Sequence, residues 1–476
     1  MQGAVPAGEQ TGRIDEGAGL SEHARPQAPD PKRVPVGGPS PARPGDAATP
    51  RQRPPALWTN RDYLGLWTGD AVSSLGSSMS AISYPLLVLF ATGSVARAGL
   101  ITAANLIGSV VTTLWGGALA DRVSRKAILV ISPLIQAAAV GVVAVFVSRG
   151  HSPLGMLIAA ALTGGLATGI RSGARTPALR RIVPKEQMAA ASSQIQGRDM
   201  AAEFFGNPLG ALLFTAARWV PFGADAVSFL FSCFGAALIR RPLGPEPAEQ
   251  AAHQSMFADV QEGLRYVSAV PFLRFIATWA PIVNMIASGY FLLFIAVLKY
   301  RGASPMTIGL TNSIALIGGI TGAVLGPVLL KRIRAKLVFL SGGWALAIGC
   351  VLTAILPIPW EIGGSVFLVM LVIVPLNAAL DSYEVRLVPD EYSGRVSSAV
   401  FFGAQSLQWV GPLLAGVLAD AFGPPSAALV FAAALIPLAL VAHHTSALNL
   451  LDLPVEQVEE YLLPEQVRHR EAARIG

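Results

Sequence analysis

The feature that most constrains this chain is a series of continuous apolar runs that recurs from near residue 62 to near residue 443. A bilayer core about 30 Å thick requires roughly 20 apolar residues when they form an α-helix. No water can satisfy backbone N–H and C=O groups at that depth, so each run must be helical; the short alternating segments of a barrel are not seen. The sequence therefore predicts an all-α polytopic membrane protein.

Composition agrees with this prediction, because only 13% of the residues are charged and 53% are hydrophobic, whereas soluble domains carry about a quarter charged residues. Cys233 and Cys350 lie inside apolar runs, and we interpret them as small hydrophobic side chains rather than a disulfide or metal pair. The spacings typical of metalloproteases, serine hydrolases, dithiol redox sites and phosphate-binding loops are not found in the sequence. We expect no enzyme activity, no cofactor and no metal site.

The runs predict twelve spans that form two bundles of six. We place the spans at residues 62–91, 98–119, 126–147, 153–173, 188–214, 219–239, 273–298, 305–330, 337–357, 362–386, 395–419 and 424–443. The corresponding domains are a disordered tail over 1–56, an N-terminal bundle over 57–240, a cytoplasmic linker over 241–272, a C-terminal bundle over 273–445 and a cytoplasmic tail over 446–476.

Two of the segments outside the bundles have helical patterns of their own. In the linker, Phe257, Val260, Leu264 and Val267 share one helical face, which favours an amphipathic helix at the membrane surface. In the C-terminal tail, "VEQVEEYLL" (455–463) is consistent with a short helix.

The distribution of Lys and Arg predicts the orientation of the spans. Loops after even-numbered spans carry most of these cations, namely Arg122, Arg125, Lys126, Arg175, Arg180, Arg181, Lys185, Arg240, Arg241, Arg265, Lys331, Arg332, Arg334 and Lys336. Because basic loops stay in the cytoplasm, both termini should be cytoplasmic. The same bias explains the net charge of +6 without a nucleic-acid partner.

An internal repeat at an offset of 205 residues supports two parallel halves. "RIVPKEQMAAASS" (181–193) aligns with "RLVPDEYSGRVSS" (386–398), and Gly206 aligns with Gly411. Such repeats are typical of secondary transporters, whose ligand site lies between the halves near the midplane.

The loop after the second span carries a more specific pattern. The pattern consists of Gly117, Asp121, Arg122, Arg125 and Lys126. Its spacing is that of the signature of the major facilitator superfamily, which the chain resembles. The departure is Ser124, where the family usually has Gly. The resemblance implies a secondary transporter that works by alternating access. It further implies that the Asp121 carboxylate faces the N-terminal end of a helix in the other half, expected to be span 11, and latches the cytoplasmic side shut.

Three segments resemble one branch of this family, the bacterial macrolide and siderophore (enterobactin-type) exporters. They are "YPLLVLFATGSVARAGL", "RTPALRRIVPKEQMAAASS" and "GADAVSFL". A partial antiporter motif adds a set of helix-bending candidates: Gly206, Pro208, Gly210, Gly411, Pro412 and Gly416. Gly and Pro are also common in membrane helices that do not bend. The Arg that many drug/proton antiporters carry in span 4 is not expected here, because Arg171 falls at the predicted cytoplasmic edge.

Charges inside spans are costly and are functional candidates by default. Asp70 lies in span 1, and Asp199 and Glu203 share one face of span 5 beside Arg198. Two close carboxylates at low dielectric could accept a proton near neutral pH. The alternative is a structural ion pair centred on Arg198, or a span that begins later and leaves these groups near the surface.

Other polar residues suit a cavity or a gate. We expect substrate contacts from Asn284, Tyr290, Asn377, Gln405, Gln408 and Trp409, since aromatic and amide groups in an apolar cavity fit an amphipathic molecule; such residues also join helices to one another. A cytoplasmic gate or a solvated rim is expected at Asp381, Glu384 and Arg386. Asp225 could cap its helix or act in transport.

Together these patterns predict proton-driven export of a small amphipathic molecule, such as an antibiotic, drug or siderophore-like metabolite, by a monomeric antiporter of the bacterial plasma membrane. Its partners would be the substrate, protons and the bilayer. The alternative is an importer of a small nutrient or metabolite. The repeat disfavours an ATP-driven permease, and no segment resembles a channel filter.

Overall fold

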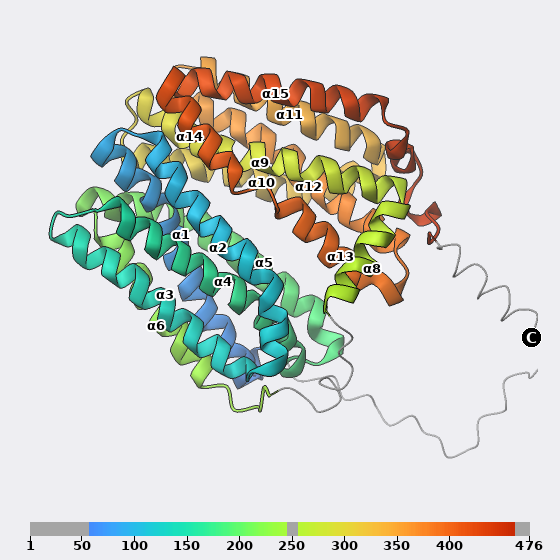
Figure 1. The fold of residues 1–476 in the computed structure, drawn as a ribbon, viewed down its shortest axis with the longest axis horizontal. Helices are drawn as coiled ribbons and strands as arrows, with labels where there is room; N and C mark the ends of the chain where they lie inside the picture. Colours follow the sequence, from blue (N-terminus) through green and yellow to red (C-terminus); the bar gives the residue numbers. More distant parts are fainter. Residues whose placement is uncertain (1–56, 245–255, 462–476) are drawn as a thin grey trace, which may run out of the picture. The chain divides into compact units, whose positions relative to one another are not determined.

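The computed structural model describes residues 57–244 and 256–461, and in these ranges every regular element is helical. The first six long helices pack on one another and form one bundle (Figure 1). They are α1 (Arg61–Thr92), α2 (Val95–Arg122), α3 (Arg125–Ser148), α4 (Leu154–Ile182), α5 (Met188–Ala216) and α6 (Val220–Ala237). The predicted tail over 1–56 lies outside the described residues.

The second bundle follows α8 (Met256–Ala269), and its helices likewise contact one another (Figure 1). They are α9 (Pro271–Tyr300), α10 (Pro305–Arg332), α11 (Ala335–Ile355), α12 (Pro359–Leu387), α13 (Asp390–Gln405), α14 (Val410–Phe422) and α15 (Pro424–His444). Short 3-10 turns occupy Leu57–Thr59, Lys185–Gln187, Ser446–Asp452 and Val455–Gln457. The residue limits of our predicted domains stay predictions.

Eleven helices in the described ranges are long and apolar enough to cross a bilayer, with Tyr392–Phe422 taken as one of them. α5 does not qualify by composition, although its 29 residues match the others in length. Its apolar character is reduced by polar residues that include Arg198, Asp199 and Glu203. Since α5 packs against α1 and α10 as a full member of the bundle, it supplies the twelfth span that the sequence predicts.

The span we predicted at 395–419 is not one continuous helix. α13 ends at Gln405, a turn covers Ser406–Trp409, and α14 begins at Val410. Pro412 lies in the first turn of α14, where its missing N–H removes no hydrogen bond of the helix.

One prediction about the outer segments needs correction. Of the helix predicted over 455–463, the described residues are helical only over Val455–Gln457, because the backbone N–H of Tyr461 instead donates to the Leu387 carbonyl, 2.9 Å away. The linker helix is present as α8, in which Val267 is buried and Leu264 is 54% exposed; its position at the membrane surface stays a prediction. α8 packs on α13 through Gly263, which lies against the Arg395 backbone. The side chains of Phe257 and Val260 lie outside the described part.

Candidate functional site

A buried carboxylate in the first bundle lies among three guanidinium groups. Asp70 of α1 is 4% exposed and pairs with Arg171 of α4 through Oδ1. Its Oδ2 lies 3.3 Å from Nε of Arg175 and 3.7 Å from Nη1 of Arg198. Arg171 also donates to the Ser232 hydroxyl at 2.6 Å. This cluster therefore joins α1, α4, α5 and α6.

The partners of Asp70 correct one sequence interpretation. We expected span 4 to end near residue 173 and Arg171 to lie at its edge, but α4 continues to Ile182. Arg171 is therefore an interior residue of the helix, directed at Asp70. The misplacement arose because span 4 was predicted to end near residue 173, whereas Arg171 and Arg175 both lie well inside α4.

Asp199 extends this cluster, whereas Glu203 does not. Asp199 Oδ1 accepts hydrogen bonds from Arg198 Nη2 at 2.7 Å and from the Ser74 hydroxyl at 2.9 Å, and its Oδ2 lies 3.8 Å from Arg175. Glu203 is exposed one turn further along α5. The ion pair centred on Arg198, which the sequence offered as an alternative to proton coupling, is thus present. A proton-coupling role for Asp70, Asp199 or Glu203 stays a prediction.

Basic residues that follow α2 form hydrogen bonds with the segment just after α6. Lys126 Nζ donates to the Ile239 carbonyl at 2.7 Å, just beyond the end of α6, and the Arg125 backbone N–H donates to the Leu243 carbonyl at 3.2 Å. A cation at a helix C-terminus is favourable because unpaired carbonyls gather there. The side chains of Asp121 and Arg122, and the surroundings of Gly117, lie outside the described part, so the latch stays a prediction.

No sequence pattern predicted the contact at the opposite end of the bundles. There Asp420, near the end of α14, accepts from the Ser94 hydroxyl at 2.6 Å and from the backbone N–H groups of Val95 and Ala96 at 2.7 and 3.2 Å. Beside it, Lys299 Nζ of α9 donates to the Leu89 carbonyl of α1 at 2.5 Å. Both contacts join the two bundles. A lone Asp at the end of an apolar run looks like an ordinary loop residue, so Asp420 was missed.

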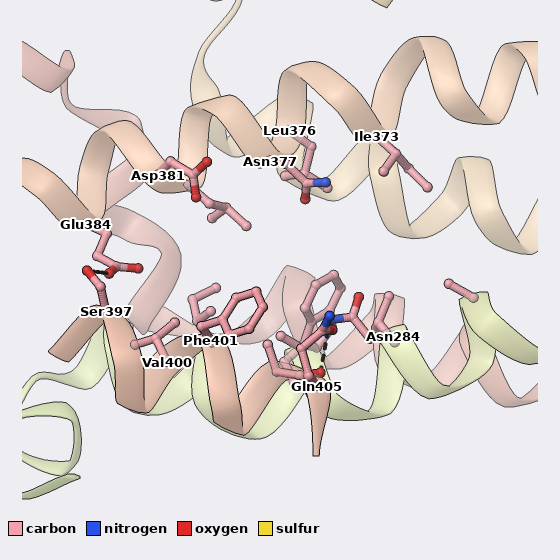
Figure 2. Close-up of a pocket in the computed structure, with 18 of the residues that line it drawn as sticks. Asn284, Ile373, Leu376, Asn377, Asp381, Glu384, Ser397, Val400, Phe401 and Gln405 are labelled. Atoms are coloured by element: carbon pink, nitrogen blue, oxygen red, sulfur yellow. Dashed lines mark hydrogen bonds between the residues drawn. The ribbon is translucent and has the colours of Figure 1, made fainter. Parts of the chain in front are cut away.

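A cavity of about 590 Å³ lies within the second bundle, between α9, α11, α12 and α13. Three of the six predicted substrate contacts line it, namely Asn284, Asn377 and Gln405. Figure 2 shows Asn377 on the wall formed by α12, facing Gln405 and Asn284 across the cavity. Most of the remaining lining is apolar.

Two carboxylates line the same cavity closer to the end of α12. Asp381 and Glu384 project from α12 on the side of Asn377 (Figure 2). Glu384 accepts from the Ser397 hydroxyl of α13 at 2.6 Å, while Arg386 is exposed nearby. The gate proposed for these residues is therefore placed at one end of the cavity, and its function stays a prediction.

The other three predicted cavity residues lie elsewhere. Tyr290 is 3% exposed in the core, where its hydroxyl is 2.8 Å from that of Thr353. Gln408 and Trp409 belong to the turn between α13 and α14, and the Gln408 carbonyl accepts from Ser288 at 2.6 Å. These contacts join helices, which is the alternative that the sequence left open.

The predicted helix-bending glycines all lie against the backbone of a neighbouring helix. A Cβ on Gly210 would lie 2.6 Å from Met79 Cα of α1, and one on Gly416 would lie 2.6 Å from Ala96 Cα of α2. A Cβ on Gly411 would likewise collide with the backbone carbonyl oxygen of Met285. Close backbone approach is the reason for small residues at these positions; their part in helix bending stays a prediction.

Comparison with known proteins agrees with this architecture. The chain is 26% identical over 399 residues to the multidrug efflux pump Tap of Mycolicibacterium fortuitum, covering 79% of this chain and 94% of Tap. It is 24% identical over 416 residues to macrolide efflux protein A of Streptococcus pyogenes, covering 83% of this chain and 98% of the relative.

Solved structures show the same fold at low identity. A mutant of the nucleoside transporter NupG superposes with a TM-score of 0.68 at 14% identity, covering 81% of this chain and 99% of NupG. A bacterial homologue of the iron transporter ferroportin in the inward-facing state gives 0.63 at 16% identity, covering 81% and 99%. The sequence pattern of the Major Facilitator Superfamily matches residues 66–410, more than half of the chain. The protein therefore belongs to the Major Facilitator Superfamily of transporters.

Proposed function

We propose that this transporter exports a small amphipathic organic molecule from the bacterial cytoplasm by alternating access, in exchange for protons. The observation that carries the proposal is the cavity of about 590 Å³ in the second bundle, whose lining is mainly apolar with three amides and two carboxylates. Its volume falls in the range of sites for drug-sized ligands, and a few polar groups in an apolar wall would orient an amphipathic molecule. The similarity to Tap and to macrolide efflux protein A supports export of a drug-like substrate.

The conformation supports alternating access. Asp420 and Lys299 join the bundles where α1 leads into α2 and α14 leads into α15, the end that the basic loops predict to be extracellular. The cavity reaches Glu384 and Ser397 toward the other end. In the proposed cycle this is the inward-facing state, ready to take substrate from the cytoplasm, and outward opening requires Asp420 to leave the α2 N-terminus.

Proton exchange would act through the cluster around Asp70. The Asp70 carboxylate lies among three guanidinium groups from α4 and α5. Protonating it would leave Asp199 as the remaining anion beside Arg175 and Arg198, so the repulsion among the three guanidinium groups would increase. Proton binding would thereby loosen the α1–α4–α5 contact, and proton release would restore it. Asp199, Glu203 and Asp70 are the residues to which we assign this coupling. We further propose a monomer with both termini in the cytoplasm.

The test uses everted membrane vesicles with an imposed pH gradient and a panel of amphipathic dyes and macrolides. We expect at least one compound to accumulate when the interior is acidic, and Asn377→Leu to lower its uptake. Val385→Ala, which alters an apolar lining residue of the same cavity and removes no polar group, is the matched control. If no compound accumulates, the antiport proposal is wrong; if a small nutrient instead enters intact cells, the protein is an importer.

A further inference from the structure

A second cavity, of about 330 Å³, lies between the first bundle and α9 of the second. Of the described residues that line the two cavities, none lines both. Most of its polar groups belong to the first bundle, among them Asp225, Gln136 and Ser80. Its apolar part includes Phe229 of α6 together with residues of α9, namely Phe291, Leu292 and Ile295.

Asp225 supplies a carboxylate that no described cation neutralises. It is 1% exposed, and its hydrogen-bond donors are three hydroxyls: Ser80 at 2.5 Å, Ser228 at 3.2 Å and Ser77 at 3.3 Å. α6 begins five residues earlier at Val220, so Asp225 does not cap it, which removes one of our two sequence interpretations. Burying a carboxylate is costly unless a positive charge compensates it. None of the described Lys, Arg or His side chains forms a salt bridge with it.

Gln136 supplies a second acceptor. Its residue is 6% exposed and its Nε2 donates to the Thr168 hydroxyl at 2.9 Å, which fixes the orientation of the amide. Its Oε1 is buried, and no described group donates to it. An unpaired buried acceptor costs free energy, so it calls for a donor from a ligand.

We propose that this cavity binds an organic ammonium ion. A charged N–H group pairs with the Asp225 carboxylate, a second donor of the ligand reaches Gln136 Oε1, and the apolar remainder packs on Phe229 and Phe291. An ammonium over an aromatic face is attracted to the ring as well. This inference rests on the proposed function in one respect, since it identifies the exported compounds as amphipathic amines.

The position of the cavity links occupancy to conformation. Ser288 and Phe291 of α9 close the cavity from the second bundle, while Asp225 and Gln136 belong to the first. A bound ammonium compound therefore contacts both bundles at once. When the bundles move apart on this side, the ligand loses its apolar contacts and is released.

The binding test uses purified protein and two fluorescent probes, dansylcadaverine, a primary ammonium compound, and its neutral N-acetyl derivative. We expect wild-type protein to bind the ammonium probe at least about tenfold more tightly, because a charged hydrogen-bonded pair is lost with the neutral probe. Asp225→Asn should abolish this preference and leave the affinity for the neutral probe unchanged. Gln136→Leu should weaken the ammonium probe severalfold.

A comparison variant, the double substitution Asp381→Asn, Glu384→Gln, neutralises both carboxylates of the first cavity and tests whether the ammonium probe binds there instead. If this variant abolishes the preference and Asp225→Asn keeps it, the ammonium site is wrongly placed and the inference fails. If Asp225→Asn does not fold, the test rests on Gln136→Leu in α3. An unchanged affinity of Gln136→Leu for the ammonium probe would also overturn the proposed site.

Failure of this inference can be distinguished from failure of the proposed function. Purified protein that prefers the ammonium probe, with no accumulation in vesicles, would sustain the site and refute proton-driven export. Vesicles that export amphipathic compounds equally well with wild-type protein and Asp225→Asn would sustain export and refute the site.

Discussion

The carboxylate of Asp420 accepts a hydrogen bond from the backbone N–H of Val95, the first residue of α2, across 2.7 Å. An anion at a helix N-terminus satisfies amides that have no partner within the helix and interacts favourably with the helix dipole. Because α2 belongs to one bundle and α14 to the other, this cap joins them. Gly416, one turn before Asp420, lets the two backbones meet at Ala96.

The first prediction concerns this cap. Asp420→Asn removes the negative charge at the α2 N-terminus, and such a charge stabilises a helix end by about 0.3–1 kcal/mol. The substitution destabilises only the conformation in which this end is closed. The fraction of molecules that are open at this end should therefore rise. Distances between spin labels at Arg97 and Phe422, both exposed, would show a longer component in double electron–electron resonance.

Asp452→Asn is the matched control for the cap. Asp452 forms a salt bridge of 2.9 Å with Lys336 within the second bundle, so its neutralisation should leave the label distances unchanged. An Asp420→Asn distribution identical to that of the wild type would show that the cap does not hold the bundles together.

The second prediction concerns the cluster around Asp70. Asp70→Asn leaves Arg171 without its carboxylate in a buried site, and breaking a buried ion pair costs about 3–5 kcal/mol. Thermal unfolding in detergent should therefore show a large loss of stability. Adding Arg171→Gln removes the unpaired charge as well, so the double variant should be more stable than Asp70→Asn alone. Additive losses in this double-mutant cycle would contradict a direct coupling.

The third prediction concerns the C-terminal segment. Tyr266 of α8 is fully buried and donates from its hydroxyl to the Tyr461 carbonyl at 2.7 Å, and Tyr461 N–H donates to Leu387. Burial raises the pKa of Tyr266 well above its ordinary value of 10.0. The hydroxyl thus remains a donor at physiological pH. Tyr266→Phe should cost about 1 kcal/mol and speed protease cleavage near Tyr461.

The pH dependence of this attachment has a definite sign. Because the pKa is raised in the folded state, the stabilisation is complete below pH 10.0, the ordinary pKa, and decreases as the pH rises further. Protease cleavage of the wild-type protein should accelerate above pH 10.0. Cleavage of Tyr266→Phe should not show this acceleration. Tyr392→Phe, an aromatic neighbour stacked on Tyr266, is the control.

The sequence predicted the spans well because a bilayer imposes length and hydrophobicity on every crossing segment. It could not predict the partners of Asp70, since Arg171 is 101 residues away and the meeting depends on how α1 packs on α4. The contact of Asp420 with the α2 N-terminus was also beyond reach. It depends on close backbone approach between α2 and α14 at Gly416, and hydropathy carries no information on such an approach.

The last prediction concerns the loop between α2 and α3. If Asp121 latches the basic-loop end when the cavity opens outward, Asp121→Asn should leave membrane insertion intact and reduce transport in vesicles strongly. Lys126→Gln is the informative comparison, because Lys126 Nζ bonds the Ile239 carbonyl within one bundle. That variant should lower thermal stability by about 1 kcal/mol while transport by the folded fraction persists. Normal transport by Asp121→Asn would mean that the loop determines orientation through its cations and does not act as a latch.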